Sequence, residues 1–253
     1  MEVLSSLKNP KIMAWRSLKD RKGRLEQGAF LVEGTKMVGE ALSSRFPVQA
    51  LLIREGYADV PETPPGVPVY LLPAHVFDTV CDTRTPQGIA AVLFPSPRPA
   101  AGPRLAALDG VQDPGNVGTI LRTADAAGLD GLLLGPDCAD CFSPKVLRAT
   151  MGSIFRMGLS FPASLPDALQ ALKAQGYEIL SSQLDGDPFY ARPEIAAPFV
   201  LVIGNEGRGI SAPVRELATR RLRLPMRGGA ESLNAAVAAG ILMYDLMRDQ
   251  PEK

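Results

Sequence analysis

An apolar run that ends abruptly in glycine and polar residues constrains the fold more than any other stretch of the chain. Residues 198–203 read Pro-Phe-Val-Leu-Val-Ile, and Gly204-Asn-Glu-Gly follows without a spacer. A short apolar run closed by turn residues is typical of a strand buried in a parallel sheet. Ligands of open α/β sheets bind beyond the carboxyl ends of the strands. The stretch therefore predicts an α/β fold with a site at the turn that carries Asn205 and Glu206.

Strands and helices are predicted to alternate through the rest of the C-terminal part. We expect strands at 105–108, 132–134, 178–181 and 222–224, and helices at 118–127, 143–152, 166–175, 211–219 and 232–248. Alternation of this kind implies a parallel sheet that helices cover on both faces. The last helix is apolar almost all round, which predicts burial either in the core of its own domain or against a second copy of the chain.

A proline-rich stretch predicts a boundary between two domains. Residues 95–103 hold four prolines in nine positions, which excludes a helix or a central strand and favours a stiff, extended linker. The residues before it predict a small α/β unit with helices at 9–25 and 35–44 and strands at 30–33, 49–53, 67–72 and 89–94. We therefore predict domains at 1–97 and 98–253.

Charge and cysteine content narrow the class of protein. The formal net charge is zero and there are three cysteines, which argues against a general nucleic-acid binder and against a disulfide framework. No apolar run reaches the ~18 residues that a membrane span needs, and the N-terminus lacks the basic and apolar regions of a secretory signal. The cytoplasm is the expected location.

Basic residues nevertheless crowd the first segment of the chain, where only Glu2 and Asp20 oppose them. Local basic clusters attract phosphate groups even when the whole chain is neutral, although a solvated helix face would explain the same pattern. The cluster consists of Lys8, Lys11, Arg16, Lys19, Arg21, Lys22 and Arg24.

Three polar clusters of the second domain could carry chemistry. They contain Asn116 with Arg122, Asn205 with Glu206, and Ser232 with Asn234. Structural explanations remain open beside the chemical one. A solvated or salt-bridged arginine would account for Arg122, and a helix N-cap would account for Ser232.

Two other interpretations of the motifs are weak. Gly207-x-Gly209-x-x-Ala212 follows a strand and opens a helix, as a dinucleotide-binding fingerprint does. It stands late in the chain, however, and no acidic residue ends the next strand, so a nicotinamide-dependent dehydrogenase stays a minor alternative. Cys138 and Cys141 form one Cys-x-x-Cys, while Cys81 and His75 fall in the other domain. We therefore expect no metal site.

Taken together and in this order, the three clusters resemble the motifs of the SpoU family of RNA ribose 2′-O-methyltransferases. The resemblance spans residues 105–247 and rests on Asn116-x-Gly-x-x-x-Arg122-Thr-Ala, Ile203-Gly-Asn-Glu-Gly207, Leu224-Pro-Met and Glu231-Ser-Leu-Asn234. The first domain is similar to the ribosomal-protein-like RNA-binding domain of the rRNA-directed members, at residues 6–11, 28–34 and 85–89.

The resemblance implies a SPOUT-type fold, in which the C-terminal segment of a parallel sheet is threaded into a deep trefoil knot. It also implies a homodimer and a site for S-adenosylmethionine in the knot. Gly204, Leu224 and Leu233 would contact the cofactor largely through backbone atoms, with Ile203 and Met226 beside them. Such a set suits an adenine ring, which needs apolar walls and backbone hydrogen bonds.

The resemblance further implies a catalytic group made of Arg122, Asn116, Glu206, Ser232 and Asn234. The reaction is the in-line attack of a ribose 2′-oxygen on the sulfonium methyl group. Some accounts of the family make the arginine the general base, but a guanidinium is not easily deprotonated. We therefore favour a role for Arg122 in binding an RNA phosphate and stabilising the developing alkoxide, with Glu206 or Asn116 orienting it.

The resemblance thus implies a two-domain RNA (ribose-2′-O)-methyltransferase with large-subunit rRNA as the expected substrate. Lys8, Lys11, Arg16, Lys19 and Lys22 are the predicted RNA contacts of the first domain. A tRNA methyltransferase and a non-catalytic RNA-binding protein of the same fold are the alternatives, and the motifs do not name the methylated nucleotide.

Overall fold

The computed structural model describes residues 1–191, Ile195 and residues 198–248. The chain divides into two compact units, of which the first contains Met1–Pro97 and Asp140–Arg156 and the second contains Arg98–Ala139 and Met157–Lys253. The segment Asp140–Arg156 lies beyond the predicted boundary at residue 97 and belongs to the first unit. The chain therefore passes between the units three times, and the functional division into 1–97 and 98–253 remains a proposal.

A mixed five-stranded sheet forms the centre of the first unit. Its order is β1-β4-β3-β5-β2, and β5 is antiparallel to both of its neighbours. The strands are β1 (Glu2–Val3), β2 (Phe30–Glu33), β3 (Val48–Arg54), β4 (Val69–Leu72) and β5 (Ile89–Leu93). The helices are α1 (Pro10–Ser17), α2 (Arg21–Gln27), α3 (Thr35–Leu42), α4 (Ala74–Val80) and α6 (Pro144–Thr150), with the 3₁₀ helix η1 (Ser153–Phe155). The sequence did not predict β1, which has only two residues, or α4.

The single helix predicted at 9–25 is wrong, because the chain turns between α1 and α2. Asn9 caps α1 by accepting a hydrogen bond from the Lys11 backbone N–H, and Pro10 occupies the first helical turn. A Cβ atom at Gly23 would lie 2.0 Å from the Ser17 carbonyl oxygen. The start of α2 therefore packs directly against the end of α1, which requires glycine at that position.

The segment Asp140–Arg156 is held in the first unit by ion pairs and aromatic contacts. The buried Arg24 pairs with Asp140 at 2.7 Å, Arg148 pairs with Asp82 at 2.7 Å and Arg156 pairs with Glu40. Two ring pairs add apolar contact, with centroids 4.8 Å apart for Phe30 and Phe142 and 5.2 Å apart for Phe46 and Phe155. This segment is thus part of the core of the first unit, although its sequence neighbours lie in the second.

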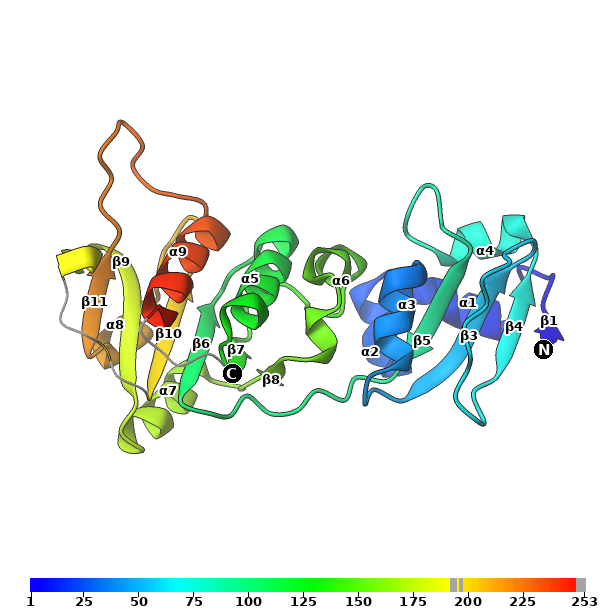
Figure 1. The fold of residues 1–253 in the computed structure, drawn as a ribbon, viewed down its shortest axis with the longest axis horizontal. Coiled ribbons are helices and arrows are strands. Elements are labelled where there is room, and N and C mark those ends of the chain that lie inside the picture. Colours follow the sequence, from blue (N-terminus) through cyan, green and yellow to red (C-terminus); the bar gives the residue numbers. More distant parts are fainter. Residues whose placement is uncertain (192–194, 196–197, 249–253) are drawn as a thin grey trace. The chain divides into compact units, whose positions relative to one another are not determined.

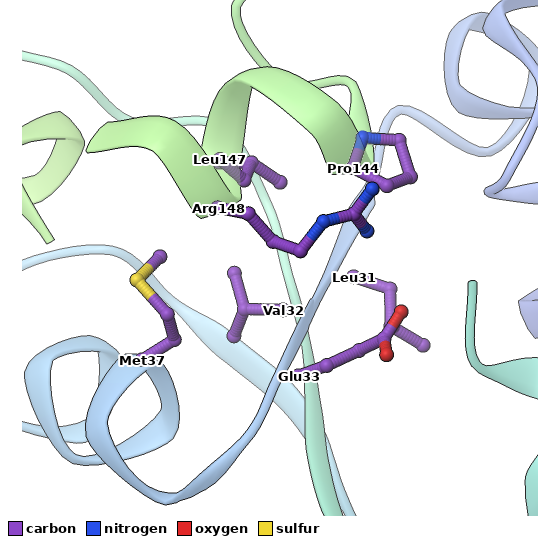
Figure 2. Close-up of a pocket in the computed structure, with 7 residues that line it drawn as sticks. All are labelled: Leu31, Val32, Glu33, Met37, Pro144, Leu147 and Arg148. Carbon is purple, nitrogen blue, oxygen red and sulfur yellow. The ribbon is translucent and has the colours of Figure 1, made fainter. Parts of the chain in front are cut away.

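A small hollow lies where this segment meets β2 and α3. Figure 2 shows its lining, which is Leu31, Val32, Glu33, Met37, Pro144, Leu147 and Arg148. Its cavity volume is about 10 Å³, which is at the lower limit for one water molecule. The hollow is therefore a small packing defect and is too small for a nucleoside or a cofactor.

A six-stranded parallel sheet forms the second unit and confirms the predicted α/β fold (Figure 1). Its order is β11-β9-β10-β6-β7-β8. The strands are β6 (Arg104–Asp109), β7 (Gly131–Leu134), β8 (Gly158–Ser160), β9 (Glu178–Pro188), β10 (Phe199–Gly204) and β11 (Arg220–Arg223). The helices are α5 (Pro114–Ala127), α7 (Leu165–Ala174), α8 (Ala212–Leu217) and α9 (Ala235–Met247), with the 3₁₀ helix η2 (Phe189–Ala191). The trefoil knot that the resemblance implies remains a prediction.

The helices cover the two faces of this sheet as separate pairs. Val200 and Val202 of β10 join Leu169 of α7 and Val214 of α8 in one apolar cluster. Helix α9 contacts β10 and α5. Because side chains alternate along a strand, Leu201 faces the opposite side from that cluster. No helix among residues 1–191 and 198–248 has the length and apolarity to cross a membrane.

Helix α9 is apolar, but its own unit covers only one side of it. Ala239, Leu242 and Met243 are buried, whereas the exposed fractions of Val237 and Tyr244 are 50% and 57%. The helix begins three residues later than predicted, at Ala235. An apolar stripe with a solvent-facing aromatic is therefore left along α9.

Candidate functional site

The junction of β6 and α5 places Asn116 in the first turn of a helix. Asp113 is the N-cap of α5, and its Oδ1 accepts a hydrogen bond of 2.9 Å from the Asn116 backbone N–H. Pro114 occupies the first helical position, where the absence of an N–H costs nothing. The Asn116 side chain is only 8% exposed. A cap and a proline thus fix a nearly buried amide at the carboxyl end of the sheet.

The loop after β10 is folded onto itself, which fixes the position of Glu206. A Cβ atom at Gly204 would lie 2.4 Å from the Gly209 carbonyl carbon, so only glycine fits there. The Asn205 Oδ1 accepts hydrogen bonds from the backbone N–H groups of Gly207 and Arg208. Its Nδ2 donates to the Gly110 carbonyl oxygen at 2.7 Å. Asn205 therefore ties this loop to the loop after β6.

Glu206 extends the tie between the two loops through its carboxylate. Its oxygens accept hydrogen bonds from the backbone N–H groups of Gln112 and Asp113, both at 3.1 Å, and from Asn116 Nδ2 at 2.9 Å. Burial alone would raise the pKa of Glu206. The hydrogen bonds from Asn116 and from the backbone N–H groups of Glu206, Gln112 and Asp113 outweigh burial and lower that pKa below its ordinary value. Glu206 is therefore a carboxylate at neutral pH.

Asn234 joins the third motif to the same network. Its Oδ1 caps α9 by accepting from the backbone N–H groups of Ala236 and Val237, and its Nδ2 donates to Asn116 Oδ1 at 2.9 Å. These partners fix the orientation of both side-chain amides. The Asn234 oxygen must face the N–H groups of α9, and the Asn116 nitrogen must face the Glu206 carboxylate. The result is one directed hydrogen-bond chain from the α9 N-terminus through Asn234 and Asn116 to Glu206.

The other two members of the predicted catalytic group stand outside this chain. Arg122 and Ser232 are exposed, and neither makes a hydrogen bond or ion pair with any residue in the described ranges. Arg122 lies six positions after Asn116 on α5, which puts the two side chains on different faces of the helix. The N-cap expected at Ser232 is in fact Asn234. The structure thus joins three of the five residues and leaves a free cation and a free hydroxyl.

The predicted cofactor residues lie at two strand ends and in the loop that follows β11. Ile203 and Gly204 end β10, Leu224 is buried just after β11, and Met226 and Leu233 lie in the long loop that leads to α9 (Figure 1). Backbone atoms of residues 225–233 make no hydrogen bond to any other described residue. Free backbone donors beside apolar side chains match what the adenine and carboxylate groups of S-adenosylmethionine require. The donor set therefore fits this cofactor.

The predicted RNA contacts of the first unit are only partly available. Lys8 and Arg16 are exposed, and Lys22 lies 3.7 Å from Glu26. Lys11 donates to Tyr70 Oη at 2.9 Å and to Glu2 Oε2 at 3.2 Å. The hydrogen bond to Tyr70, and then the one to Glu2, raises the pKa of Lys11.

Two further members of the basic cluster are less available than their charge suggested. Lys19 is half-buried. Arg24, which the charge count grouped with the others, is 8% exposed and donates to the carbonyl oxygens of Leu18 and Lys19 besides pairing with Asp140. Arg24 is therefore a structural residue.

The contacts that hold the site together were not predicted from the sequence, although Asn205 and Glu206 were named there as site residues. Asp113, Asn205 and Gly110 were not singled out for the contacts that link the two loops. The Asp113-Pro114 pair was a usable signal, because an acidic N-cap followed by proline marks the start of a helix. No group of three or more metal-ligating side chains occurs in the part of the chain that the structure describes.

Family models match both parts of the chain. Residues 103–244 match the model described as the SpoU rRNA Methylase family. Residues 9–91 match the model described as the MRM3-like substrate binding domain. The first match includes Asn116, Glu206 and Asn234, and the second includes most of the sheet of the first unit.

Relatives of nearly the same length agree with these matches. The chain is 40% identical over 248 residues to the 23S rRNA (guanosine(2553)-2′-O)-methyltransferase RlmP of Bacillus subtilis (strain 168), covering 97% of this chain and 99% of that protein. It is 30% identical over 261 residues to a 23S rRNA (uridine(2479)-2′-O)-methyltransferase of Streptomyces viridochromogenes, covering 96% and 91%. The crystal structure of an AdoMet-bound rRNA methyltransferase from Sinorhizobium meliloti superposes with a TM-score of 0.87 at 31% identity, covering 99% of each chain. The chain therefore belongs to the SpoU rRNA methylase family.

Proposed function

We propose that this protein transfers a methyl group from S-adenosylmethionine to a ribose 2′-hydroxyl of large-subunit rRNA. The observation that carries the proposal is the directed hydrogen-bond chain from Glu206 through Asn116 to Asn234. It brings three segments that are 90 and 118 residues apart in sequence to one end of the sheet. The relatives described above, whose names specify 23S rRNA, support the substrate class.

Arg122 is the group best suited to act on the reacting ribose. When bound, the cofactor supplies an electrophilic methyl group. In such a transfer the 2′-oxygen would form a bond to the methyl carbon as the carbon–sulfur bond breaks and the neutral thioether leaves. The hydroxyl proton would pass to solvent water, so negative charge would develop on the oxygen during the step. Arg122 is exposed and has no carboxylate partner among the described residues, so its planar fork is free to bind a phosphate and to stabilise that oxygen.

Glu206 is a positioning residue in this scheme and not the general base. A good base at neutral pH has a pKa near 7, whereas hydrogen bonds lower the pKa of Glu206. Its three donors already occupy the carboxylate and fix the Asn116 amide. Ser232 is exposed and unbonded within the described ranges, which leaves its hydroxyl free to contact the RNA or Arg122 once substrate is bound.

We also propose that the protein acts as a homodimer in the cytoplasm, through the exposed stripe of α9. Val237, Ile241 and Tyr244 follow one another at helical spacing. The exposed fractions of Val237 and Tyr244 are 50% and 57%. Burying such side chains stabilises an interface by ~1.5–3 kcal/mol each. Light scattering should give twice the chain mass, and Tyr244→Asp should give the monomer. A monomeric wild-type protein would remove the dimer proposal and leave the catalytic one intact.

The substrate is tested by labelled methyl transfer. Purified protein and tritiated S-adenosylmethionine are incubated with rRNA or tRNA, and ribose methylation is mapped in a deletion strain and its parent. One large-subunit rRNA position should lose its 2′-O-methyl group in the deletion strain and regain it with the wild-type gene. A lost tRNA position would favour the tRNA alternative, and RNA binding without transfer would favour the non-catalytic one.

The role of Arg122 is tested by a conservative substitution. Arg122→Lys keeps the charge but loses the planar, two-pronged donor set. Removing a preorganised oxyanion donor costs about 10²–10³ in kcat, so kcat should fall by that order while the affinity for cofactor stays unchanged. Near-complete retention of kcat would exclude two-pronged positioning by Arg122.

A further inference from the structure

Six arginines are concentrated between residues 208 and 227. This twenty-residue stretch contains one acidic residue, Glu216, and no lysine. It begins in the loop after β10, passes through α8 and β11 and ends in the loop that leads to α9. The arginines are Arg208, Arg215, Arg220, Arg221, Arg223 and Arg227. A run of this kind in a chain of zero net charge calls for a physical explanation.

The structure divides these arginines into two that have partners and four that have none. Arg220 pairs with Glu178 at 2.7 Å, and Arg215 Nη2 donates to the Ile210 carbonyl oxygen. The other four are exposed, and no carboxylate of the described residues lies within 4.0 Å of their guanidinium groups. The four are Arg208, Arg221, Arg223 and Arg227, and we call them the arginine rim.

The arginine rim lies at the edge of the sheet that carries the candidate site. Arg208 is two residues after Glu206, and Arg223 is the last residue of β11. Parallel strands have their carboxyl ends at the same end of the sheet, so β10 and β11 finish on the same side as the candidate site. Only β9 separates these two strands, which puts their axes about 10 Å apart.

Protection of a sheet edge does not account for the whole rim. Strand β11 is at the edge of the sheet, and charged side chains on edge strands prevent pairing with other chains. This explanation covers Arg221 and Arg223 but not Arg208 or Arg227, which lie in loops. All four are arginine, whose planar donor fork suits a phosphate better than the lysine that edge protection favours.

We infer that the arginine rim binds phosphates of the RNA strand that flanks the target nucleotide, as a second RNA surface separate from the basic residues of the first unit. The inference rests on the proposed function, because it assumes that RNA reaches this end of the sheet. Phosphate contacts position a nucleic acid without reading its sequence. The rim therefore sets the path of the strand at the site and leaves nucleotide choice to other groups.

The test removes the rim charges in pairs and measures the salt dependence of RNA binding. The variants are Arg221→Gln/Arg223→Gln, Arg208→Gln/Arg227→Gln and the combination of all four. The matched control is Arg215→Gln/Arg248→Gln, which removes two charges from the same unit at side chains that already have partners. The probe is a full-length transcript of large-subunit rRNA, and binding of S-adenosylmethionine is followed in parallel by calorimetry.

Each lost phosphate contact flattens the plot of log affinity against log salt by about 0.7 for single-stranded RNA. Each rim pair should therefore lower the slope by about 1.4, and all four by about 2.8. Between about 50 and about 200 mM salt, the wild type should then weaken about 50-fold more than the fourfold variant. The RNA affinity of the control variant and the cofactor affinity of every variant should stay within about twofold of the wild type. Arginine-to-lysine changes at the rim should restore most of the slope.

Three outcomes would overturn the inference. One is an unchanged slope in the fourfold variant while the wild type still methylates rRNA. Another is that the Arg221→Gln/Arg223→Gln variant binds RNA normally and is the only variant that aggregates, which would indicate that these arginines protect the edge strand from pairing. The third is that the variant with all four substitutions methylates naked rRNA normally but loses activity on assembled ribosomal subunits, which would indicate that the rim contacts a protein partner. If the wild type methylates no RNA at all, the proposed function itself fails, and the transfer assay distinguishes this case from the other three.

Discussion

Two arginine- and lysine-rich stretches of this chain look alike in sequence and differ in structure. The first, residues 8–24, contains seven basic residues, and the second, residues 208–227, contains six. In the first, Arg24 is buried on Asp140, Lys11 is held by Tyr70 and Glu2, and Lys22 lies near Glu26. In the second, four of six arginines have no partner in the described part of the chain. A count of charges therefore overstates the cationic surface of the first stretch, where three of seven charges are ion-paired with described residues, more than that of the second, where one of six is.

The largest expected contrast between the stretches concerns stability. Arg24→Ala would leave the mostly buried Asp140 and two backbone carbonyl groups without their partner. Breaking a buried ion pair on one side costs about 3–5 kcal/mol, and we expect a loss of this order in the first unit. Arg223→Ala should change the free energy of unfolding by less than about 0.5 kcal/mol. Denaturant unfolding followed by the fluorescence of Trp15 measures the loss of unfolding free energy in Arg24→Ala. An equal loss in Arg24→Ala and Arg223→Ala would contradict the expected difference between the two stretches.

Acid should reduce the contribution that Glu206, which lies beside the second stretch, makes to the free energy of unfolding. The pKa of Glu206 is lowered on folding, so its stabilising contribution is complete above the unfolded value of about 4.3. The contribution is lost as the pH falls through the lower folded value. The difference in unfolding free energy between the wild type and Glu206→Gln should thus be constant from about pH 8 to about pH 6 and shrink below about pH 4. A difference that grows on acidification would contradict the lowered pKa.

A smaller effect should separate Lys8 from Lys11 in RNA binding. Lys8 is exposed and its ammonium group has no ion-pair partner among described residues, whereas Glu2 already neutralises Lys11. Lys8→Gln should flatten the salt dependence of rRNA affinity by about 0.7, and Lys11→Gln should flatten it by less. Filter binding at four salt concentrations would resolve the two. Equal slopes would mean that RNA displaces Glu2 from Lys11.

The smallest effect is expected at Lys22. Its ammonium group lies 3.7 Å from Glu26, and both side chains are more than half exposed. An exposed pair of this kind on a helix contributes roughly 0.3–0.5 kcal/mol. Lys22→Ala should therefore leave the thermal transition of the first unit within about 2 °C of the wild type. A shift as large as that of Arg24→Ala would show that the first stretch is structural throughout.

Local patterns predicted the elements of the second unit better than its contacts. The apolar run at 198–203 became β10, and Asn116, Glu206 and Asn234 were named as site residues from their motifs. The tie from Asn205 to Gly110 was not predictable, because it joins residues 95 positions apart. The same reason hid the pairing of Arg24 with Asp140, which are 116 positions apart. Sequence periodicity records local geometry, whereas these bonds depend on how the chain returns to itself.

The break between α1 and α2 shows a second limit. The apolar spacing of Ile12, Trp15 and Leu18 continues smoothly, and it predicted one long helix. The break depends on the contact of Gly23 with the end of α1, a tertiary feature that a glycine in a helical pattern does not reveal by itself. Ser232 and Asn234 were similar, since both are good N-caps and only the partner Asn116 selects Asn234.

The threefold passage of the chain between the units limits how this protein can be rebuilt. A graft of residues 1–97 onto another methyltransferase would leave behind Phe142 and Phe155, which complete the aromatic contacts of Phe30 and Phe46. The portable module is instead discontinuous and includes Asp140–Arg156. Recombination at a single point near the proline-rich stretch would divide this folded core, so an exchange of the whole first unit takes three junctions, after residues 97, 139 and 156.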